Sequence, residues 1–169
     1  KGQAYWTNCS AFSHDGARVA TGSETIDDVA RVWETETGAE LFAFRGNGGS
    51  VWSVCFSPDD RMLAIGGQDG KIRLQDLTTG KEFRTLKGLS RVVTSVSFSP
   101  DGKWILAGSQ DNTVRMWDVD GGSEIAVLQR HSSTVSAVQF SPDGRHILTA
   151  SRDNTAFIMD VESLTKTTP

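Results

Sequence analysis

A motif that recurs every 42 residues constrains this chain more than any other feature. Each copy joins a turn of Phe-Ser-Pro-Asp-Gly type to a later Trp-Asp position, most completely between Val93 and Asp118. The Phe stands at Phe12, Phe56, Phe98 and Phe140, and the Trp position at Trp33, Gln75, Trp117 and Met159. The Phe steps are 44, 42 and 42, and the Trp steps are all 42. Four tandem repeats therefore fill the chain, and the two extra residues of the first belong to an acidic loop at 24–28.

Within each repeat the apolar pattern predicts four short antiparallel strands. The first strand has apolar residues at a spacing of three then two, as at Val51, Val54 and Phe56. A β-bulge explains this spacing, because one extra residue restores the inward face. A repeat of about 40 to 45 residues that ends in Trp-Asp is typical of a four-stranded propeller blade, whereas paired-helix repeats need apolar residues at 3.6 spacing. We therefore predict an all-β chain of four four-stranded antiparallel sheets.

Composition narrows the possible partners and compartments. No apolar run reaches the roughly 18 residues of a membrane-spanning helix. The net charge is −4, and Lys and Arg are scattered singly along the sequence, so neither nucleic acid nor membrane is expected as a partner. Cys9 and Cys55 have no second Cys or His at metal-ligand spacing. We interpret them as buried free thiols, which suits a reducing compartment such as the cytoplasm.

With four copies of the turn and Arg115-Met116-Trp117-Asp118 at matching phase, the chain resembles the WD40 repeat family over essentially its whole length. The resemblance implies a β-propeller around an axial channel that serves as a binding platform for proteins or peptides. It implies no cofactor, no metal and no catalytic residue. The three His residues agree, because they occupy non-equivalent positions and form no catalytic or metal-binding set.

The family also implies a structural hydrogen-bonded set in each repeat, formed by a turn Asp, a His from the entering loop, a strand hydroxyl and the Trp. The matching residues are Asp69, Asp111 and Asp153 for the Asp, His131 for the His, Ser23, Ser109 and Ser151 for the hydroxyl, and Trp33 and Trp117 for the Trp. No repeat has the full set, so Asp69 and Asp111 need another partner or exposure to water. We interpret the column Arg31, Arg73 and Arg115 as a solvated stripe rather than an ion-pair ladder.

The resemblance places partner contacts on the face that carries the entering loops and the turns between the second and third strands. The candidate contact residues there are Trp52, Thr94, Ser136, Gln68, Gln110 and Arg152. Trp52 is a large aromatic residue where the other closely matching copies have small polar ones. It is either a binding anchor or a side chain packed against a neighbouring blade, and the sequence leaves both open.

The chain is treated as a single domain, 1–169, with blades at about 4–46, 47–88, 89–130 and 131–169. Propellers close with about four to eight blades, which leaves three explanations open. The sequence is part of a larger ring, two chains pair into an eight-bladed ring, or four blades close alone. The predicted function is a non-catalytic protein- or peptide-binding scaffold. The alternative is a structural module in which two chains form an eight-bladed ring.

Overall fold

The structure is a computed structural model that describes residues 6–24 and 29–165. Apart from Glu24, the predicted acidic loop lies outside the described residues. The described elements are β1 (Thr7–Phe12), β2 (Arg18–Ser23), β3 (Val29–Glu34), β4 (Glu40–Arg45), β5 (Val51–Phe56), β6 (Met62–Gly67), β7 (Ile72–Asp76), β8 (Lys81–Leu86), β9 (Val93–Phe98), β10 (Trp104–Ser109), β11 (Val114–Asp118), β12 (Glu124–Leu128), β13 (Val135–Phe140), β14 (His146–Ser151), β15 (Ala156–Asp160) and α1 (Val161–Thr165).

The strands form four antiparallel sheets in chain order, which confirms the all-β prediction. Three sheets have four strands each, β1 to β4, β5 to β8 and β9 to β12. Among the described residues the fourth sheet has β13, β14 and β15, one strand fewer than expected for each repeat. There the chain turns after Asp160 into α1, which contacts β12 and β15. Val161 on this helix is buried in the apolar cluster between the third and fourth sheets.

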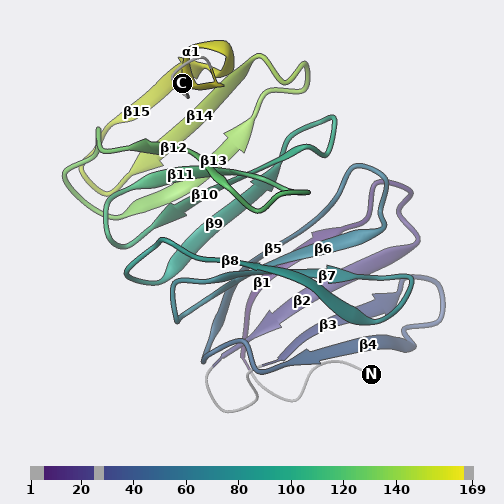
Figure 1. The fold of residues 1–169 in the computed structure, drawn as a ribbon. Helices are drawn as coiled ribbons and strands as arrows, with labels where there is room; N and C mark the ends of the chain where they lie inside the picture. The colour runs from purple at the N-terminus through teal and green to yellow at the C-terminus, as the bar shows by residue number, and fades with distance from the viewer. Residues whose placement is uncertain (1–5, 25–28, 166–169) are drawn as a thin grey trace.

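The four sheets, or blades, follow one another in space as they do in sequence (Figure 1). The first strands are neighbours, because β1 contacts β5, β5 contacts β9 and β9 contacts β13. Three apolar clusters fill the spaces between successive blades. Blades 1 and 4 lie at opposite ends of the array, so each has one face with no neighbouring blade among the described residues.

The small residue near the end of each second strand permits this close packing. A Cβ added at Gly66 would lie 2.8 Å from a methyl of Val93, and one added at Gly108 would lie 2.5 Å from a methyl of Val135. Side chains do not approach each other this closely, so any residue other than Gly would force the neighbouring blade to shift. The fourth blade has Ala150 at this position.

Local geometry agrees with the pattern of the repeats. Each first strand contains an irregularity in its pairing with the second strand near its start, which is the predicted bulge. In the turn, the Ser99 hydroxyl lies 2.6 Å from an Asp101 carboxylate oxygen and accepts a hydrogen bond from the Trp104 N–H at 2.9 Å. These bonds connect the two ends of the turn, so the strands on either side are held in register.

Candidate functional site: one face of the blade array

Strand pairing places the loops at two ends of the sheets, which we name the entry face and the turn face. In blade 2, Val51 at the start of β5 pairs with Gly67 at the end of β6. The entry face therefore carries the loops that lead into the first strands and the turns between second and third strands. The turn face carries the Ser-Pro-Asp-Gly-type turns and the connections into the fourth strands. Neighbouring blades are aligned alike, since the Val96 N–H donates to the Ser53 hydroxyl at 3.0 Å.

The bulge residues form one column on the entry side of the first strands. In blade 2, Val51 pairs with Gly67 and Ser53 with Gly66, which leaves Trp52 as the extra residue. The same argument gives Asn8, Thr94 and Ser136 in the other blades. The sequence indicated three of these four residues and missed Asn8, because the first strand of that repeat matches the others only loosely.

Polar bulge side chains hydrogen-bond to backbone carbonyls. The Asn8 amide donates to the Val51 carbonyl of the next blade at 3.3 Å. The Thr94 hydroxyl lies 3.0 Å from the Gly108 carbonyl and also contacts the Val135 carbonyl of the next blade. Ser136 donates to Ala150 of its own blade at 3.1 Å. Trp52 differs, because its side chain is a large aromatic ring, and 39% of its surface is exposed. It therefore presents an aromatic surface to solvent where the other blades use small polar groups.

The second column of candidate residues lies beside the first. The backbone N–H groups of Gln68, Gln110 and Arg152 donate to Ser50, Val92 and Thr134, at 3.0, 3.0 and 2.9 Å. Each acceptor directly precedes the first residue of a first strand. Because the bulge residue is only two positions further along the chain, the two predicted columns lie side by side on the entry face.

In blade 4 the Asp and the His of the structural set are in contact. His131 is buried, and its Nδ1 lies 3.1 Å from an Asp153 carboxylate oxygen. Hydrogen bonds from the Thr155 hydroxyl and from the Ser132 and Thr155 N–H groups, against partial burial, hold the pKa of Asp153 well below its usual range. The arrangement keeps the turn and the entering loop together.

The hydroxyl that contacts His131 is two residues from the predicted Ser151. His131 Nε2 lies 2.9 Å from the Thr149 hydroxyl, whereas the Ser151 hydroxyl accepts the Asp153 N–H at 3.1 Å and donates to the Ser133 carbonyl at 3.0 Å. The Ser109 hydroxyl likewise accepts the Asp111 N–H at 3.1 Å and lies 3.4 Å from the Arg91 carbonyl. Residues two apart on a strand share a face, so alternation alone could not distinguish Thr149 from Ser151. What distinguishes the two residues is their position along the strand.

The remaining turn carboxylates have partners other than His. Asp69 pairs with Arg73 at 2.8 Å and Lys71 at 3.1 Å. Burial alone would raise its pKa, but bonds from these two cations lower it to about 2. Asp111 accepts the Ser90 N–H at 2.8 Å and the Thr113 hydroxyl at 2.6 Å. Both carboxylates are therefore satisfied, as the sequence required.

The Arg column is not a solvated stripe, so that interpretation was wrong. Arg31 contacts Glu40 at 3.1 Å, Arg73 contacts Asp69, and Arg115 contacts Glu124 at 2.6 Å. Each pair lies within a single blade. A strand pattern cannot show this, because two of the three carboxylates come from the fourth strand, whose register follows only from the folded sheet.

The two Trp residues of the set use different acceptors. Trp33 donates to the Thr21 hydroxyl at 2.9 Å, and the buried Trp117 donates to the Lys87 carbonyl at 3.2 Å. Blade 3 has Ala107 where blade 1 has Thr21. The indole of Trp117 therefore bonds to the backbone of the entering loop instead.

Residues that could hold a metal do not gather in the described part of the chain, where no group of three His, Cys, Asp or Glu side chains has suitable geometry. Cys9 and Cys55 are free, and burial raises the pKa of each thiol to about 12. Among the same residues, no helix has the length and apolar character to cross a bilayer.

Comparison with known proteins agrees with this architecture. The model of the WD domain, G-beta repeat family matches residues 1–34, 38–76, 80–118 and 122–160, and the chain belongs to this WD40 family. Each matched segment ends with a third strand, so the later segments begin in the last strand of one blade and continue into the next. Proteins built of these repeats generally serve as scaffolds for protein interactions.

Individual relatives match over part of the chain. A periodic tryptophan protein 2 homolog of Dictyostelium discoideum is 35% identical over 46% of this chain and 8% of its own length. Human coronin-7 is 32% identical over 39% of this chain and 7% of its own. Small ribosomal subunit protein RACK1 of Neurospora crassa is 32% identical over 46% of this chain and 24% of its own. The chain thus spans under a quarter of the length of each of these relatives.

Proposed function

We propose that this chain is a non-catalytic scaffold that binds a protein or peptide segment through its entry face. The observation that carries the proposal is Trp52, an exposed aromatic side chain on the bulge of β5. Interfaces concentrate their binding energy in such residues, because a large rigid side chain excludes much water at a small entropic cost. Gln68 and Gln110 lie in the neighbouring column and add polar groups around this anchor.

The scaffold role also agrees with the family and with the chemistry of the site. The turn carboxylates Asp69, Asp111 and Asp153 are engaged in local hydrogen bonds, and these serve to fix the turns. The two free, partly buried thiols suit a reducing compartment, and we place the protein in the cytoplasm. The partner class is a protein or peptide, with no cofactor.

The test is a selection of random peptides displayed against the intact chain. The affinity of the selected peptides should fall by about tenfold or more in Trp52→Ala, as expected when an aromatic anchor is truncated. The control is Phe83→Ala, which removes an aromatic residue that is 46% exposed on the outer strand β8. The melting temperature should be unchanged in both variants. If Trp52→Ala lowers stability and leaves peptide affinity intact, Trp52 is a packing residue and the proposal is wrong.

A second candidate function is self-association of two chains into an eight-bladed ring. Two large apolar side chains on the outward faces favour it, Phe12 on blade 1 and Ile158 on blade 4, which are 67% and 73% exposed. Such faces are a liability in water. In this ring blade 4 of one copy would pack against blade 1 of the other.

The mass of the chain in solution tests this second candidate. A dimer at micromolar concentration that becomes monomeric in Ile158→Ser would support it. A wild-type chain that is monomeric throughout that range would rule it out. The control is Phe83→Ser, since Phe83 is an exposed aromatic residue away from both outward faces.

A further inference from the structure

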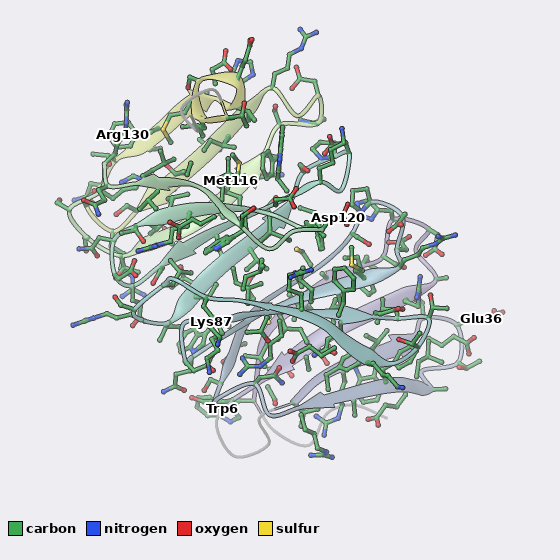
Figure 2. The ribbon with its side chains drawn as sticks, viewed as in Figure 1. Trp6, Glu36, Lys87, Met116, Asp120 and Arg130 are labelled. Carbon is green, nitrogen blue, oxygen red and sulfur yellow. The ribbon has the colours of Figure 1, made fainter. Side chains whose placement is uncertain are left out.

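Charge is distributed unequally between the two faces of the array, although Lys and Arg are scattered singly along the sequence. In blades 2 to 4, the entry-face loops 46–50, 68–71, 87–92, 110–113, 129–134 and 152–155 carry five basic residues and three acidic ones. Blade 1 has an acidic sequence, Glu24 to Asp28, between its second and third strands, so the basic excess belongs to blades 2 to 4. The basic residues are Lys71, Lys87, Arg91, Arg130 and Arg152. The turn-face loops 57–61, 77–80, 99–103, 119–123 and 141–145 carry five acidic residues and three basic ones. Figure 2 shows Lys87 and Arg130 at one end of the sheets and Glu36 and Asp120 at the other.

In blades 2 to 4 the acidic groups of the entry face are already engaged. Asp69 is paired with Lys71 and Arg73, Asp111 accepts bonds from its own turn and entering loop, and Asp153 does the same next to His131. These bonds hold the carboxylates in place and reduce what they can offer to a partner. Four cations remain, and within the described part of the chain none of them is in an ion pair. They are Lys87, Arg91, Arg130 and Arg152, and all four are exposed.

These cations lie on the same face as Trp52. Arg152 itself belongs to the second column. The loop that carries Arg91 lies against the turn of blade 2, because a Cβ at Gly70 would lie 2.5 Å from the Leu89 carbonyl and 2.9 Å from the Arg91 carbonyl. Lys87 and Arg130 directly follow the outer strands β8 and β12. In blades 2 to 4 the entry face therefore combines an exposed aromatic residue with four cations that are unpaired among the described residues, on a protein whose overall net charge is −4.

We infer that the entry face selects an acidic peptide segment, with an apolar residue placed on Trp52 and Asp or Glu side chains facing the four cations. The inference rests on the proposed scaffold function and adds the chemistry of the partner. Rim charges of this kind act mainly on association rate and on the choice of partner. The acidic turn face repels the same peptide, so the charge distribution also determines which face it uses.

The same peptide selection tests the inference. Peptides selected on the wild-type chain should be rich in Asp and Glu around an apolar residue. Their affinity should fall by about tenfold or more when Arg91→Glu and Arg152→Glu are combined. The matched control combines Lys103→Glu and Arg145→Glu on the turn face, which changes the net charge equally. The loss should shrink as salt shortens the Debye length from about 30 Å at 0.01 M to about 8 Å at 0.15 M.

The possible outcomes separate the two proposals. Peptides that depend on Trp52 but show no acidic bias, and no response to the entry-face reversal, leave the scaffold in place and overturn the inference. A selection with no peptide that depends on Trp52 contradicts the scaffold site itself. Single-stranded oligouridine that binds more tightly than the selected peptides, and is lost on the same charge reversal, would assign the basic face to nucleic acid and overturn the inference.

Discussion

The faces that meet between blades and the faces that have no neighbour carry residues of the same columns, yet their environments are opposite. Phe56, Phe98 and Phe140 are at most 8% exposed, whereas the equivalent Phe12 is 67% exposed. On the other side of the blade, Leu74 and Met116 are buried while Ile158 is 73% exposed. Each repeat therefore supplies two apolar faces, and each face needs a neighbouring blade to cover it.

The outward face of blade 4 also differs in its chemistry. The Ser53 and Ser95 hydroxyls accept backbone N–H groups of the next blade, at 3.0 and 3.1 Å. Blade 4 has Ala137 at this position, and it has Ala150 where the other blades have Gly. A neighbour on this face would lack the hydroxyl acceptor and would meet an extra methyl group. Any such contact must therefore be wider than the interfaces within the chain.

The largest expected effect on stability comes from replacing two Phe residues of the same column by Ala, one covered by a neighbouring blade and one open to solvent. Phe56→Ala should lower the free energy of unfolding by about 3–5 kcal/mol, because it leaves a cavity between blades 1 and 2. Phe12→Ala should change it by less than about 0.5 kcal/mol, since the side chain is already in water. Urea unfolding of both variants measures the difference. Equal losses would mean that a neighbour covers Phe12 in solution.

A smaller effect is expected where the blades approach most closely. Gly108→Ala places a methyl 2.5 Å from a Val135 methyl, and the overpacking should cost about 1–3 kcal/mol. The control is Ala150→Gly, which removes the equivalent methyl from blade 4 and should cost under about 1 kcal/mol through backbone entropy alone. Thermal unfolding at matched concentration compares the two. If Gly108→Ala is tolerated, the blades are packed less closely than the structure shows.

The repeat pattern predicted most of the fold, because turns, bulges and apolar columns depend on residues close together in sequence. The turn into α1 after Asp160, and the ion pairs of Arg31 and Arg115 with carboxylates of the fourth strands, depend on contacts between elements that short-range patterns do not contain. Of the candidate contact residues, the bulge positions followed from spacing. The set of exposed cations did not, because Lys87, Arg91, Arg130 and Arg152 lie in different loops and share one face only after folding.

Two departures from the repeat consensus are far apart in sequence but form a single contact. His14 stands in the Pro position of its turn, and Asp60 stands in the Gly position of the next. Asp60 accepts the His14 N–H at 2.8 Å and the Asp15 N–H at 3.0 Å, and the His14 ring lies 3.0 Å away. A Pro at position 14 would have no N–H to donate. The two substitutions therefore compensate each other across the interface between blades 1 and 2.

The smallest predicted effect on stability concerns this contact, which among the described residues occurs between blades 1 and 2 and not at the other two interfaces between blades. Asp60 has a φ of 58°, so Asp60→Gly relieves strain while it removes the bonds to His14, and the two effects should nearly offset, within about 1 kcal/mol at neutral pH. The pair His14→Pro with Asp60→Gly should be at least as stable as the wild-type chain, so that the single changes are not additive.

The pH dependence identifies the carboxylate as the group responsible. Burial would raise the pKa of Asp60, but hydrogen bonds from the His14 N–H, the His14 ring and the Asp15 N–H hold it below its usual value. A lowered folded pKa stabilises the chain above the ordinary Asp pKa of about 4, and this contribution disappears as the pH falls below it. Asp60→Gly should therefore lose less stability than wild type between pH 5 and pH 2, measured by urea unfolding across that range. Parallel pH profiles would place the acid sensitivity elsewhere and make the interface between blades 1 and 2 equivalent to the others.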